Sequence, residues 1–538
     1  MTPVTGKTLL IGSGPCARRI AEDILTQASD LIIASTGEGF GGSTTPVSRD
    51  TAEEWARVYT RTKVHSCRGT AGNFKVVLER NGEKRTAAVD TVIIAEDEKR
   101  TACFSAYGLT GTAKVMALSQ LEKLLHEIPE DDNLFTGIKT VVFLVGIDTE
   151  SNPVILEEIM QSCLKLQAEH KRKIYILTKN LKVAASGLEK LYRDTKDAGV
   201  IYIKFTHTRP DIIQQADGSV CIEFTDEITG SILKLTADLT IVDEKIVPSD
   251  YAVDLARIFE LEQDLTGFAQ GDNVHRLTVF TNRKGILVAG PARGVQSLSD
   301  QFADADNAVL SLRNIEKQPA DQIAAKAQIE NGKCVRCLTC FRLCPYRAIQ
   351  VNTRMSIAPA ACEGCGLCLA ECPRRAISLE EPKKITDSKM PAAGVNGQGR
   401  ESYVPSIKAF CCSRSAAGAA QLAAWMGKKL PHGFQIVEVP CGGTVSLSHI
   451  LTAFNSNSDG VMILTCHEGN CHSEVGPRHA QQRVEQIWDH FRSIGLEGGR
   501  LVKKTLASSM GVEFAGTLVE FERQLLEMGP IRLKSGKK

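Results

Sequence analysis

The feature that most constrains this chain is a cysteine pattern that occurs twice in a short stretch. Both copies read C-x2-C-x2-C-x3-C-P, and each cysteine of the second copy follows its counterpart by 28 residues. The repeat extends into the Arg-Ala-Ile sequences at 347–349 and 375–377. The cysteines are Cys334, Cys337, Cys340 and Cys344 in the first copy and Cys362, Cys365, Cys368 and Cys372 in the second. A chain of 538 residues buries its own core without disulfides, so thiols at this spacing indicate metal ligands.

This spacing resembles that of the bacterial two-cluster ferredoxin. In such ferredoxins the fourth cysteine of each run ligates the cluster held by the other run. The resemblance implies two 4Fe-4S clusters. One is held by Cys334, Cys337, Cys340 and Cys372, and the other by Cys362, Cys365, Cys368 and Cys344. The alternative is structural zinc, which favours two separated C-x2-C pairs.

Five further cysteines follow short buried strands near the C-terminus. Residues 407–410, 434–439 and 461–464 read as strands, with helical patterns at 415–428 and 445–454. The strand ends of an open parallel sheet form one crevice, which would bring together Cys411, Cys412, Cys441, Cys466 and Cys471. Four thiolates hold an iron–sulfur cluster, so we expect one of Cys411 and Cys412 to be spare. The alternative is buried structural thiols, and His467 and His472 are expected outside the ligand set.

The N-terminal half indicates a dinucleotide-binding fold. A strand at 8–11, a G-x-G-x-x-A turn through Gly12, Gly14 and Ala17, a helix to about 26 and a strand at 31–34 form a β-α-β unit. Later strands are predicted at 90–95, 238–242 and 285–290, and a second unit at 141–145 and 174–177. Ser35 stands where such folds carry a ribose-binding acid, and the acidic pairs at 96–97 and 243–244 would repel a pyrophosphate. A scaffold without its cofactor is therefore the alternative.

The order of these parts resembles a known family. Residues 5–315 with the ferredoxin segment are similar to the flavin-containing subunit of heterodisulfide reductases and to the second flavoprotein subunit of the quinone-interacting membrane-bound oxidoreductase. The motifs are Asn-Phe-Lys at 73–75, Tyr-Gly at 107–108 and the segment 285–290. The resemblance implies FAD, with binding residues at Gly12, Gly14, Ala17, Ser35, Gly41, Gly42 and Gly290.

Residues 405–530 resemble the delta subunit of methyl-viologen-reducing hydrogenases. The motifs are Phe-Cys-Cys at 410–412, Pro-Cys-Gly-Gly at 440–443 and Cys-His-x-Gly-x-Cys-His at 466–472. The resemblance implies a 2Fe-2S cluster in this region. Ser415 stands where that family often has a further cysteine.

The composition of the chain argues against some classes of function. The formal charge is +1 and aromatic residues make up 5% of the chain, which argues against a dedicated nucleic-acid binder. No apolar run reaches the roughly 18 residues of a membrane span, and no signal peptide is visible. We therefore expect a cytoplasmic protein that meets a membrane only through a partner. The other five cysteines, Cys16, Cys67, Cys103, Cys163 and Cys221, are expected to be mostly core residues.

The expected architecture is multi-domain α/β. It comprises a two-dinucleotide-binding (Rossmann-like) domain at 1–315, a linker helix at 316–329, a 2x4Fe-4S ferredoxin domain at 330–380, a linker at 381–404 and a C-terminal α/β iron–sulfur domain at 405–533. The expected function is that of an electron-transfer subunit of an oxidoreductase complex in anaerobic energy metabolism, with flavoprotein, heterodisulfide-reductase-like or hydrogenase-like chains as partners. One alternative is a self-contained flavin enzyme that acts on NAD(P) or a small disulfide. The other is a flavin-free scaffold that docks partner subunits.

Overall fold

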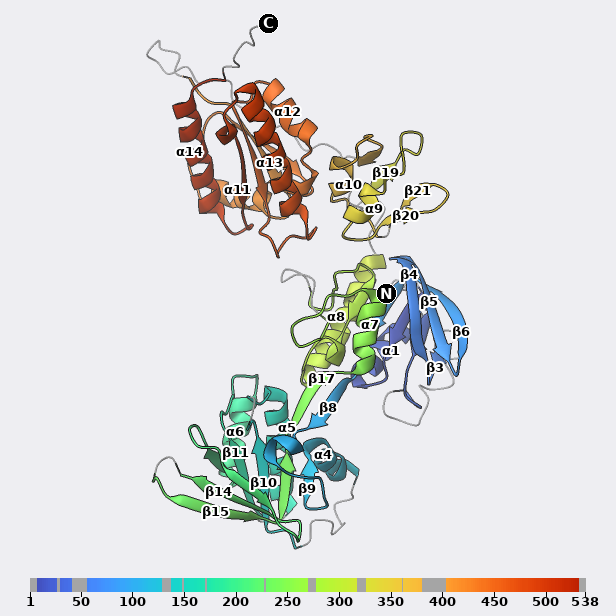
Figure 1. Ribbon diagram of the computed structural model, residues 1–538, viewed down its shortest axis with the longest axis vertical. Coiled ribbons are helices and arrows are strands. Elements are labelled where there is room, and N and C mark those ends of the chain that lie inside the picture. The colour runs from blue at the N-terminus through green and yellow to red at the C-terminus, as the bar shows by residue number, and fades with distance from the viewer. Residues whose placement is uncertain are drawn as a thin grey trace.

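The computed structural model describes residues 7–26, 30–40, 56–127, 137–147, 150–169, 172–226, 229–269, 277–316, 326–359, 361–379 and 403–531. Gly41 and Gly42, most of the predicted linker at 381–404 and residues 317–325 lie outside these ranges. The chain folds into four modules, and along the long axis the module around β10(Thr140–Val145) lies at one end, the module around α1(Pro15–Leu25) in the middle, and the ferredoxin-like and C-terminal modules side by side at the other end (Figure 1). The α/β class predicted from the sequence is confirmed.

The first module is built on a five-stranded parallel sheet. Its order is β18(Ile286–Val288), β7(Thr91–Ile94), β1(Thr8–Ile11), β2(Leu31–Ala34) and β3(Ala56–Tyr59). β1, β2, β7 and β18 are buried along their whole length, as expected of parallel strands covered on both faces. α1(Pro15–Leu25) and α8(Leu298–Glu316) pack on one face. The other face is covered by α7(Asp250–Phe259) and an antiparallel sheet of β4(Lys63–Thr70), β5(Asn73–Arg80) and β6(Glu83–Val89).

The second module repeats the parallel arrangement. Its sheet has the order β12(Ile201–Lys204), β11(Lys173–Thr178), β10(Thr140–Val145), β16(Leu239–Val242) and β9(Val115–Ala117). The helices of this module are α3(Phe104–Tyr107), α4(Leu118–Glu127), α5(Pro153–Glu169) and α6(Leu188–Asp197). A second antiparallel sheet consists of β13(Asp211–Gln214), β14(Val220–Thr225) and β15(Ile232–Ala237). Two antiparallel strands, β8(Glu98–Ala102) and β17(Glu244–Pro248), connect this module to the first.

The ferredoxin-like module is small and irregular. It contains β19(Ala327–Ile329), α9(Thr339–Leu343), β20(Ile349–Val351), β21(Met355–Ile357), α10(Leu367–Ala370) and β22(Ile377–Leu379). The predicted linker helix at 316–329 is wrong at its end, because Ala327–Ile329 is a strand that pairs antiparallel with β22. The pairing buries Ala327, and this tertiary contact overrides the helical preference of an alanine-rich, charged segment.

The C-terminal module is a third parallel sheet with helices on both faces. The strand order is β24(Phe434–Val439), β23(Ile407–Cys412), β25(Gly460–Thr465) and β26(Leu501–Thr505). α11(Ala416–Trp425) and α14(Gly511–Met528) cover one face, and α12(Leu447–Asn455) and α13(Gly476–Ile494) cover the other. The three strands predicted here are confirmed. No helix among the described residues is long and apolar enough to cross a membrane.

Candidate metal centres

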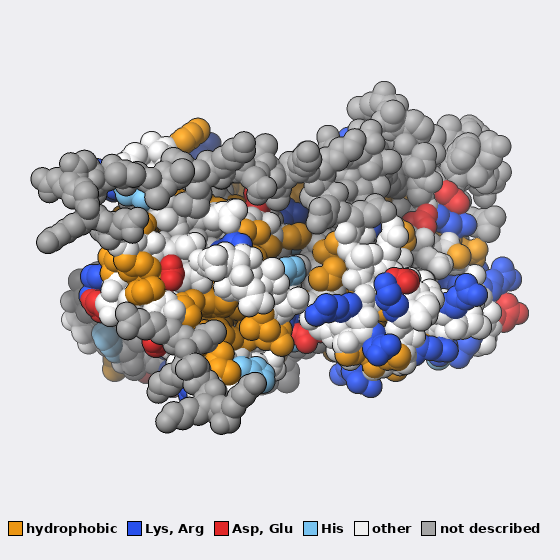
Figure 2. Space-filling view, turned by 90° about the horizontal axis from the view of Figure 1, so that it is seen from above, with side chains coloured by type: hydrophobic (Ala, Val, Ile, Leu, Met, Phe, Trp, Pro, Cys, Tyr) orange, Lys and Arg blue, Asp and Glu red, His pale blue; other side chains and the backbone are white. Residues whose placement is uncertain are grey.

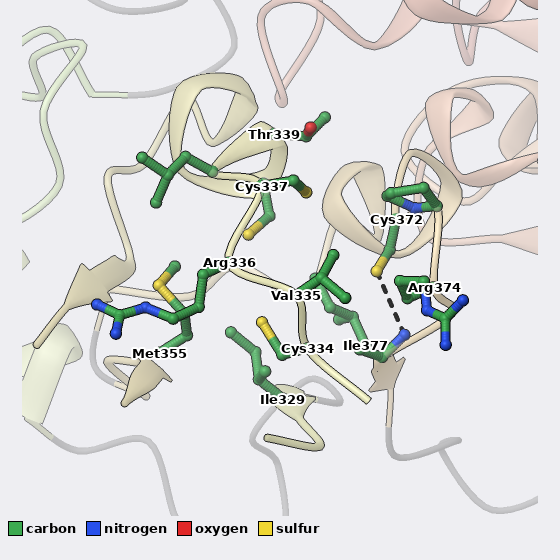
Figure 3. Close-up of a pocket in the computed structure, with 14 residues that line it drawn as sticks. Ile329, Cys334, Val335, Arg336, Cys337, Thr339, Met355, Cys372, Arg374 and Ile377 are labelled. Atoms are coloured by element: carbon green, nitrogen blue, oxygen red, sulfur yellow. Dashed lines mark hydrogen bonds between the residues drawn. The ribbon is translucent and has the colours of Figure 1, made fainter. Parts of the chain in front are cut away.

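The first four-sulfur site lies at the outer end of the ferredoxin-like module. One cavity is lined by Cys334, Cys337, Cys340 and Cys372, the set that the crossed ligand pattern predicts. In Figure 3 the sulfur atoms of Cys334, Cys337 and Cys372 surround one space. The backbone N–H of Ala376 donates to Cys372 Sγ at 3.2 Å. Such N–H to sulfur bonds stabilise a thiolate, so the donor set fits a cubane cluster.

The second four-sulfur site lies at the inner end of the same module. Its cavity is lined by Cys344, Cys362, Cys365 and Cys368, which is the other predicted set. The N–H groups of Ala348 and Gly364 donate to Cys344 Sγ and Cys362 Sγ, both at 3.4 Å. The repeat therefore places equivalent N–H donors at Cys344 and Cys372.

Burial separates the two sites electrostatically. Desolvation raises the pKa of Cys368 to about 12 and raises the pKa of Cys365 further above its ordinary value. Cys337 in the outer site is exposed, and hydrogen bonding with Thr339 lowers its pKa. Cys365 and Cys368 therefore hold their protons until a metal displaces them, whereas Cys337 offers a thiolate to solvent more readily.

Four other sulfurs meet at the ends of the C-terminal strands. Cys412, Cys441, Cys466 and Cys471 are buried and pack together. Cys412 Sγ and Cys466 Sγ lie 3.6 Å apart. Two sulfurs bound to one tetrahedral metal at about 2.3 Å would lie roughly 3.8 Å apart, so this pair fits one iron of a cluster. Hydrogen bonds among the four thiols lower the pKa of Cys466 and Cys441 and raise those of Cys412 and Cys471.

Cys411 is the spare member of the adjacent pair. Its side chain lies in the core with α11 and α14, and its thiol contacts the carbonyl oxygen of Ala409. Successive residues of a strand point to opposite faces, so Cys411 cannot reach the site that Cys412 reaches. Of the five candidate cysteines, Cys411 is therefore the one that the structure places away from the sulfur cluster.

Two further residues lie beside the four sulfurs, and of these only Ser415 was marked by the sequence. A Cβ atom on Gly476, the first residue of α13, would lie 2.4 Å from Cys441 Sγ and 3.3 Å from Cys471 Sγ. The uncapped N-terminus of this 19-residue helix therefore lies against both sulfurs, where its dipole favours negative charge. The hydroxyl of Ser415 is buried beside these thiols, and hydrogen bonding with it lowers the pKa of Cys466. A hydroxyl donor beside these thiols fits an anionic cluster.

The two histidines have other contacts. His467 Nε2 lies 3.5 Å from Met510 Sδ, and His472 Nε2 lies 3.7 Å from Glu363. His472 also accepts a hydrogen bond from Tyr346 at its carbonyl oxygen. His472 therefore belongs to the junction with the ferredoxin-like module. Among the five remaining cysteines, Cys16, Cys163 and Cys221 are buried, and Cys67 and Cys103 are half-buried.

The inner ferredoxin site and the C-terminal site are in direct contact. Cys365 packs against the four C-terminal sulfurs, and the Thr444 hydroxyl donates to the Cys365 carbonyl oxygen at 2.5 Å. Gly366 has a φ of +74° and approaches so closely that a Cβ there would lie 2.7 Å from Thr444. Only glycine adopts this backbone without strain, and only glycine leaves room for Thr444.

A buried arginine locks this junction. Arg483 on α13 donates to Glu371 Oε1 at 2.7 Å and to the carbonyl oxygens of Gly443 and Val445 at 2.5 and 2.8 Å. Its side chain is 5% exposed. The ion pair joins the two modules at a site with no spacing signal in the sequence.

The dinucleotide site has the backbone expected of such folds, but a carboxylate lies where the pyrophosphate of a dinucleotide would bind. A Cβ on Gly12 would lie 2.0 Å from the Ala95 carbonyl oxygen, so the turn packs closely as in dinucleotide folds. A Cβ on Gly14 would lie 1.9 Å from Asp97 Oδ1, so a carboxylate occupies the N-terminus of α1 where a pyrophosphate would bind. Burial raises the pKa of Asp97 to about 6 and of Glu96 to about 7.

The other predicted FAD residues have internal partners. Ser35 is buried, and its hydroxyl accepts from the N–H of Gly37. Ala17 is buried in the core beside α8. The N–H of Gly290 donates to Asp304, and a Cβ there would lie 2.7 Å from Cys16 Sγ. With Asp97 ionised, the residues present do not fit a pyrophosphate.

The fold and the three sulfur sites define an iron–sulfur protein on a scaffold of dinucleotide-binding type. Residues 326–373 match the 4Fe-4S dicluster domain, and residues 407–529 match the family described as methyl-viologen-reducing hydrogenase, delta subunit. The iron-sulfur protein of the F420-non-reducing hydrogenase vhc of Methanococcus voltae is 33% identical over 134 residues, which cover 25% of this chain and 93% of that protein. Through residues 407–529 the chain belongs to the methyl-viologen-reducing hydrogenase delta-subunit family.

Other relatives match the remaining modules. A relative from Methanosarcina acetivorans, which is one of the subunits of the ferredoxin/F(420)H(2)-dependent CoB-CoM heterodisulfide reductase, is 27% identical over 355 residues, which cover 65% of this chain. The chain spans 44% of the length of that relative. A thioredoxin reductase of T. acidophilum is 15% identical, with a TM-score of 0.38 over 58% of this chain and 99% of that one.

Proposed function

We propose that this protein is a cytoplasmic electron-transfer subunit of an oxidoreductase complex of the heterodisulfide reductase type. It relays single electrons between the two cubane clusters of the ferredoxin-like module and a third cluster, of the 2Fe-2S type, in the C-terminal module. Similarity to subunits of heterodisulfide reductases and hydrogenases supports an assembly with such chains. The 2Fe-2S assignment rests on four converging cysteines and on the 3.6 Å separation of Cys412 and Cys466.

The observation that carries this proposal is the contact of Cys365 with the C-terminal sulfurs. A ligand of the inner cubane and the ligands of the third cluster lie in one buried cluster of side chains. Electron tunnelling slows exponentially with distance, so contact between ligand shells favours fast exchange. The hydrogen bond from Thr444 to Cys365 fixes the cysteine ligands of the inner cubane relative to those of the third cluster.

FAD binding remains a prediction, and no electron step is assigned to it. The carboxylate of Asp97 occupies the end of α1 that a pyrophosphate would need. Like charges at contact distance oppose binding. The relay proposed here needs only the three sulfur sites.

The test uses the full chain with its clusters reconstituted anaerobically. Electrons are introduced photochemically, and rapid freezing followed by electron paramagnetic resonance records which cluster is reduced over time. We expect the C-terminal signal to rise as the cubane signals fall. In the Cys441→Ser/Cys466→Ser variant the cubane signals should persist and the third signal should vanish, with about two fewer irons per chain. A third signal that survives in this variant, or that never exchanges with the cubanes, would contradict the relay.

A further inference from the structure

The ferredoxin-like module is basic in a nearly neutral chain, and this bears on the partner of the proposed relay. Residues 326–379 contain eight Lys and Arg residues and three Glu residues, whereas the whole chain has a formal charge of +1. The rest of the chain is therefore slightly acidic. In Figure 2 Lys and Arg side chains gather on the half of this face that carries the ferredoxin-like module, while the half with the C-terminal module shows mostly apolar and uncharged side chains.

The acidic residues of the module are already paired. Glu330 pairs with Lys333, Glu363 with Lys284, and Glu371 with Arg483. Five arginines remain exposed, and the structure shows no ion pair for them within the described residues. They are Arg336, Arg342, Arg354, Arg374 and Arg375. The positive charge of the module is thus turned to solvent rather than neutralised inside it.

Two of these arginines line the outer sulfur site, and a third belongs to a helix that carries one of its cysteines. Arg336 and Arg374 line its cavity, and in Figure 3 they lie on opposite sides of the sulfur atoms. Arg342 belongs to α9, which carries Cys340. Cys337 is exposed, so the outer cluster would come within reach of a protein seated on this face.

Two exposed apolar side chains belong to the same segment as Cys337. Val335 and Phe341 are 59% and 48% exposed. They flank Cys337 in the sequence on either side. Protein interfaces usually combine exposed apolar side chains with polar and charged ones, and arginine is enriched in them.

We propose that the face formed by Val335, Arg336, Phe341, Arg342 and Arg374 is the docking surface for an acidic one-electron carrier protein. This inference rests on the proposed function and adds the chemistry of its partner. One electron passes between the outer cluster and the redox centre of the carrier, so one is oxidised as the other is reduced and no proton or bond is exchanged. The inner site faces the C-terminal module through Cys365, so the module has one internal and one external end.

Electrostatic steering gives this surface a kinetic signature. Opposite charges on two docking faces raise the association rate by about 10- to 1,000-fold at low salt, and the gain falls as ionic strength rises. Exposed charges are screened beyond about 10 Å at 0.1 M salt. The rate of electron exchange with an acidic partner should therefore depend strongly on salt and on these arginines.

The test measures electron exchange between the full-length holoprotein and an acidic plant-type 2Fe-2S ferredoxin by stopped-flow, in both redox directions, at about 0.03 and about 0.5 M salt. The variant is Arg342→Glu/Arg374→Glu, since Arg336 donates to the Asn352 carbonyl oxygen and is left in place. Lys428→Glu/Lys429→Glu is the matched control, because it makes the same charge change at exposed positions of the C-terminal module. Iron content and cubane resonance signals verify that all three proteins carry their clusters.

We expect the rate of the arginine variant to fall by about tenfold or more at low salt and to approach the rate of the unaltered protein at high salt. The lysine control should stay within about twofold of the unaltered protein, since its change lies in another module. The docking surface would be overturned if the two variants exchanged electrons with the ferredoxin at equal rates. It would also be overturned if the exchange rate did not depend on salt concentration. Arginine-dependent binding of duplex DNA or RNA that outcompetes the ferredoxin would overturn it in favour of a nucleic-acid surface.

Failure of the relay gives a different result. If the ferredoxin reduces the outer cluster but the C-terminal signal does not follow, the docking surface stands and the relay is wrong. If photochemically introduced electrons reach the C-terminal cluster but the rate of exchange with the ferredoxin does not depend on the arginine charges, the relay stands and the docking surface is wrong.

Discussion

At the scale of single residues, Gly476 leaves no room for a side chain at the C-terminal site. A methyl group there would overlap Cys441 Sγ at 2.4 Å. We expect Gly476→Ala to displace that sulfur and to lower the occupancy of the C-terminal cluster severalfold, while the cubanes stay intact. Iron content and visible absorption of the reconstituted protein measure this.

Gly516 supplies the control for that change. It lies exposed on α14, where an added Cβ would meet nothing within 4 Å. Gly516→Ala should stabilise the helix by roughly 0.5 to 1 kcal/mol and leave all three clusters in place. Equal cluster loss in the two variants would show that the contact with Cys441 is not the cause.

Asp97 controls the dinucleotide site through its charge. Its pKa is raised to about 6, so it is ionised at neutral pH and becomes neutral as the pH falls below that value. Affinity for FAD should therefore rise as the pH falls from 8 to 5.5, and Asp97→Asn should raise it at pH 8 by roughly fivefold or more, since one like charge at contact costs on the order of 1 kcal/mol even in water. Fluorescence titration with FAD measures both effects.

Asp211→Asn is the matched control for Asp97→Asn. Asp211 is exposed on β13 in the second module, so its change removes the same charge without touching Gly14. If the affinity for FAD depends neither on pH nor on Asp97, the carboxylate of Asp97 does not limit FAD binding. Absence of binding at every pH in every variant would favour the flavin-free scaffold.

At the scale of secondary-structure elements, the connection between the first two modules concentrates acidic groups. Arg100 on β8 pairs with Glu158 at 2.8 Å and lies 4.0 Å from Glu122 and 3.8 Å from Glu244. Desolvation and the neighbouring Glu158 raise the pKa of Glu122 to about 7. A single arginine therefore does not compensate all of these carboxylates.

Glu122 should make the stability of this connection depend on pH. A carboxyl with a raised pKa in the folded state stabilises the fold at low pH, and this stabilisation is lost as the pH rises from about 4.5 to about 7. Above pH 7, Glu122→Gln should raise the free energy of unfolding by on the order of 1 kcal/mol after solvent screening, and with it the melting temperature. Below pH 4.5 the substitution should have no effect on either quantity. Thermal denaturation across this pH range checks the sign, and a larger effect at low pH would contradict it.

Strands were easier to predict than the contacts between them. Short apolar runs such as 8–11 and 434–439 are parallel strands, whose period and flanking turns are local signals. The end of the predicted helix at 316–329 was wrong because the strand at Ala327–Ile329 depends on a partner some 50 residues away.

The candidate site shows the same division. The resemblance to two-cluster ferredoxins grouped the eight cysteines into the same two sets that line the two cavities. Alternation along a strand predicted that Cys411 or Cys412 is spare, but which face meets the core depends on the helices packed there. Gly476 and Arg483 carry no spacing signal and meet the site only through tertiary packing.

At the scale of the whole molecule, the ion pair of Arg483 and Glu371 should hold the two cluster-bearing modules together. Glu371→Gln keeps the bonds of Arg483 to Gly443 and Val445 and removes only the opposite charge. We expect faster amide hydrogen exchange on both sides of the junction, at residues 367–371 and 440–446, and slower arrival of electrons at the C-terminal cluster. Hydrogen-exchange mass spectrometry and the freeze-quench experiment measure the two effects.

Glu330→Gln is the control for this change. Glu330 forms an exposed pair with Lys333, 2.6 Å apart, and an exposed pair contributes only about 0 to 1 kcal/mol. Exchange at the junction should be unaltered in that variant. Unchanged exchange in both variants would show that the ion pair of Arg483 and Glu371 does not hold the modules together.

The close approach of Gly366 to Thr444 also defines what can be exchanged between related proteins. The two residues belong to different modules. They fit closely, because a side chain at position 366 would have no room against Thr444. A chimaera cut between residues 379 and 403 would pair one half of this contact with an unrelated half. The ferredoxin-like module and the C-terminal module are therefore constrained to be transplanted together, so that the two halves of this contact stay matched.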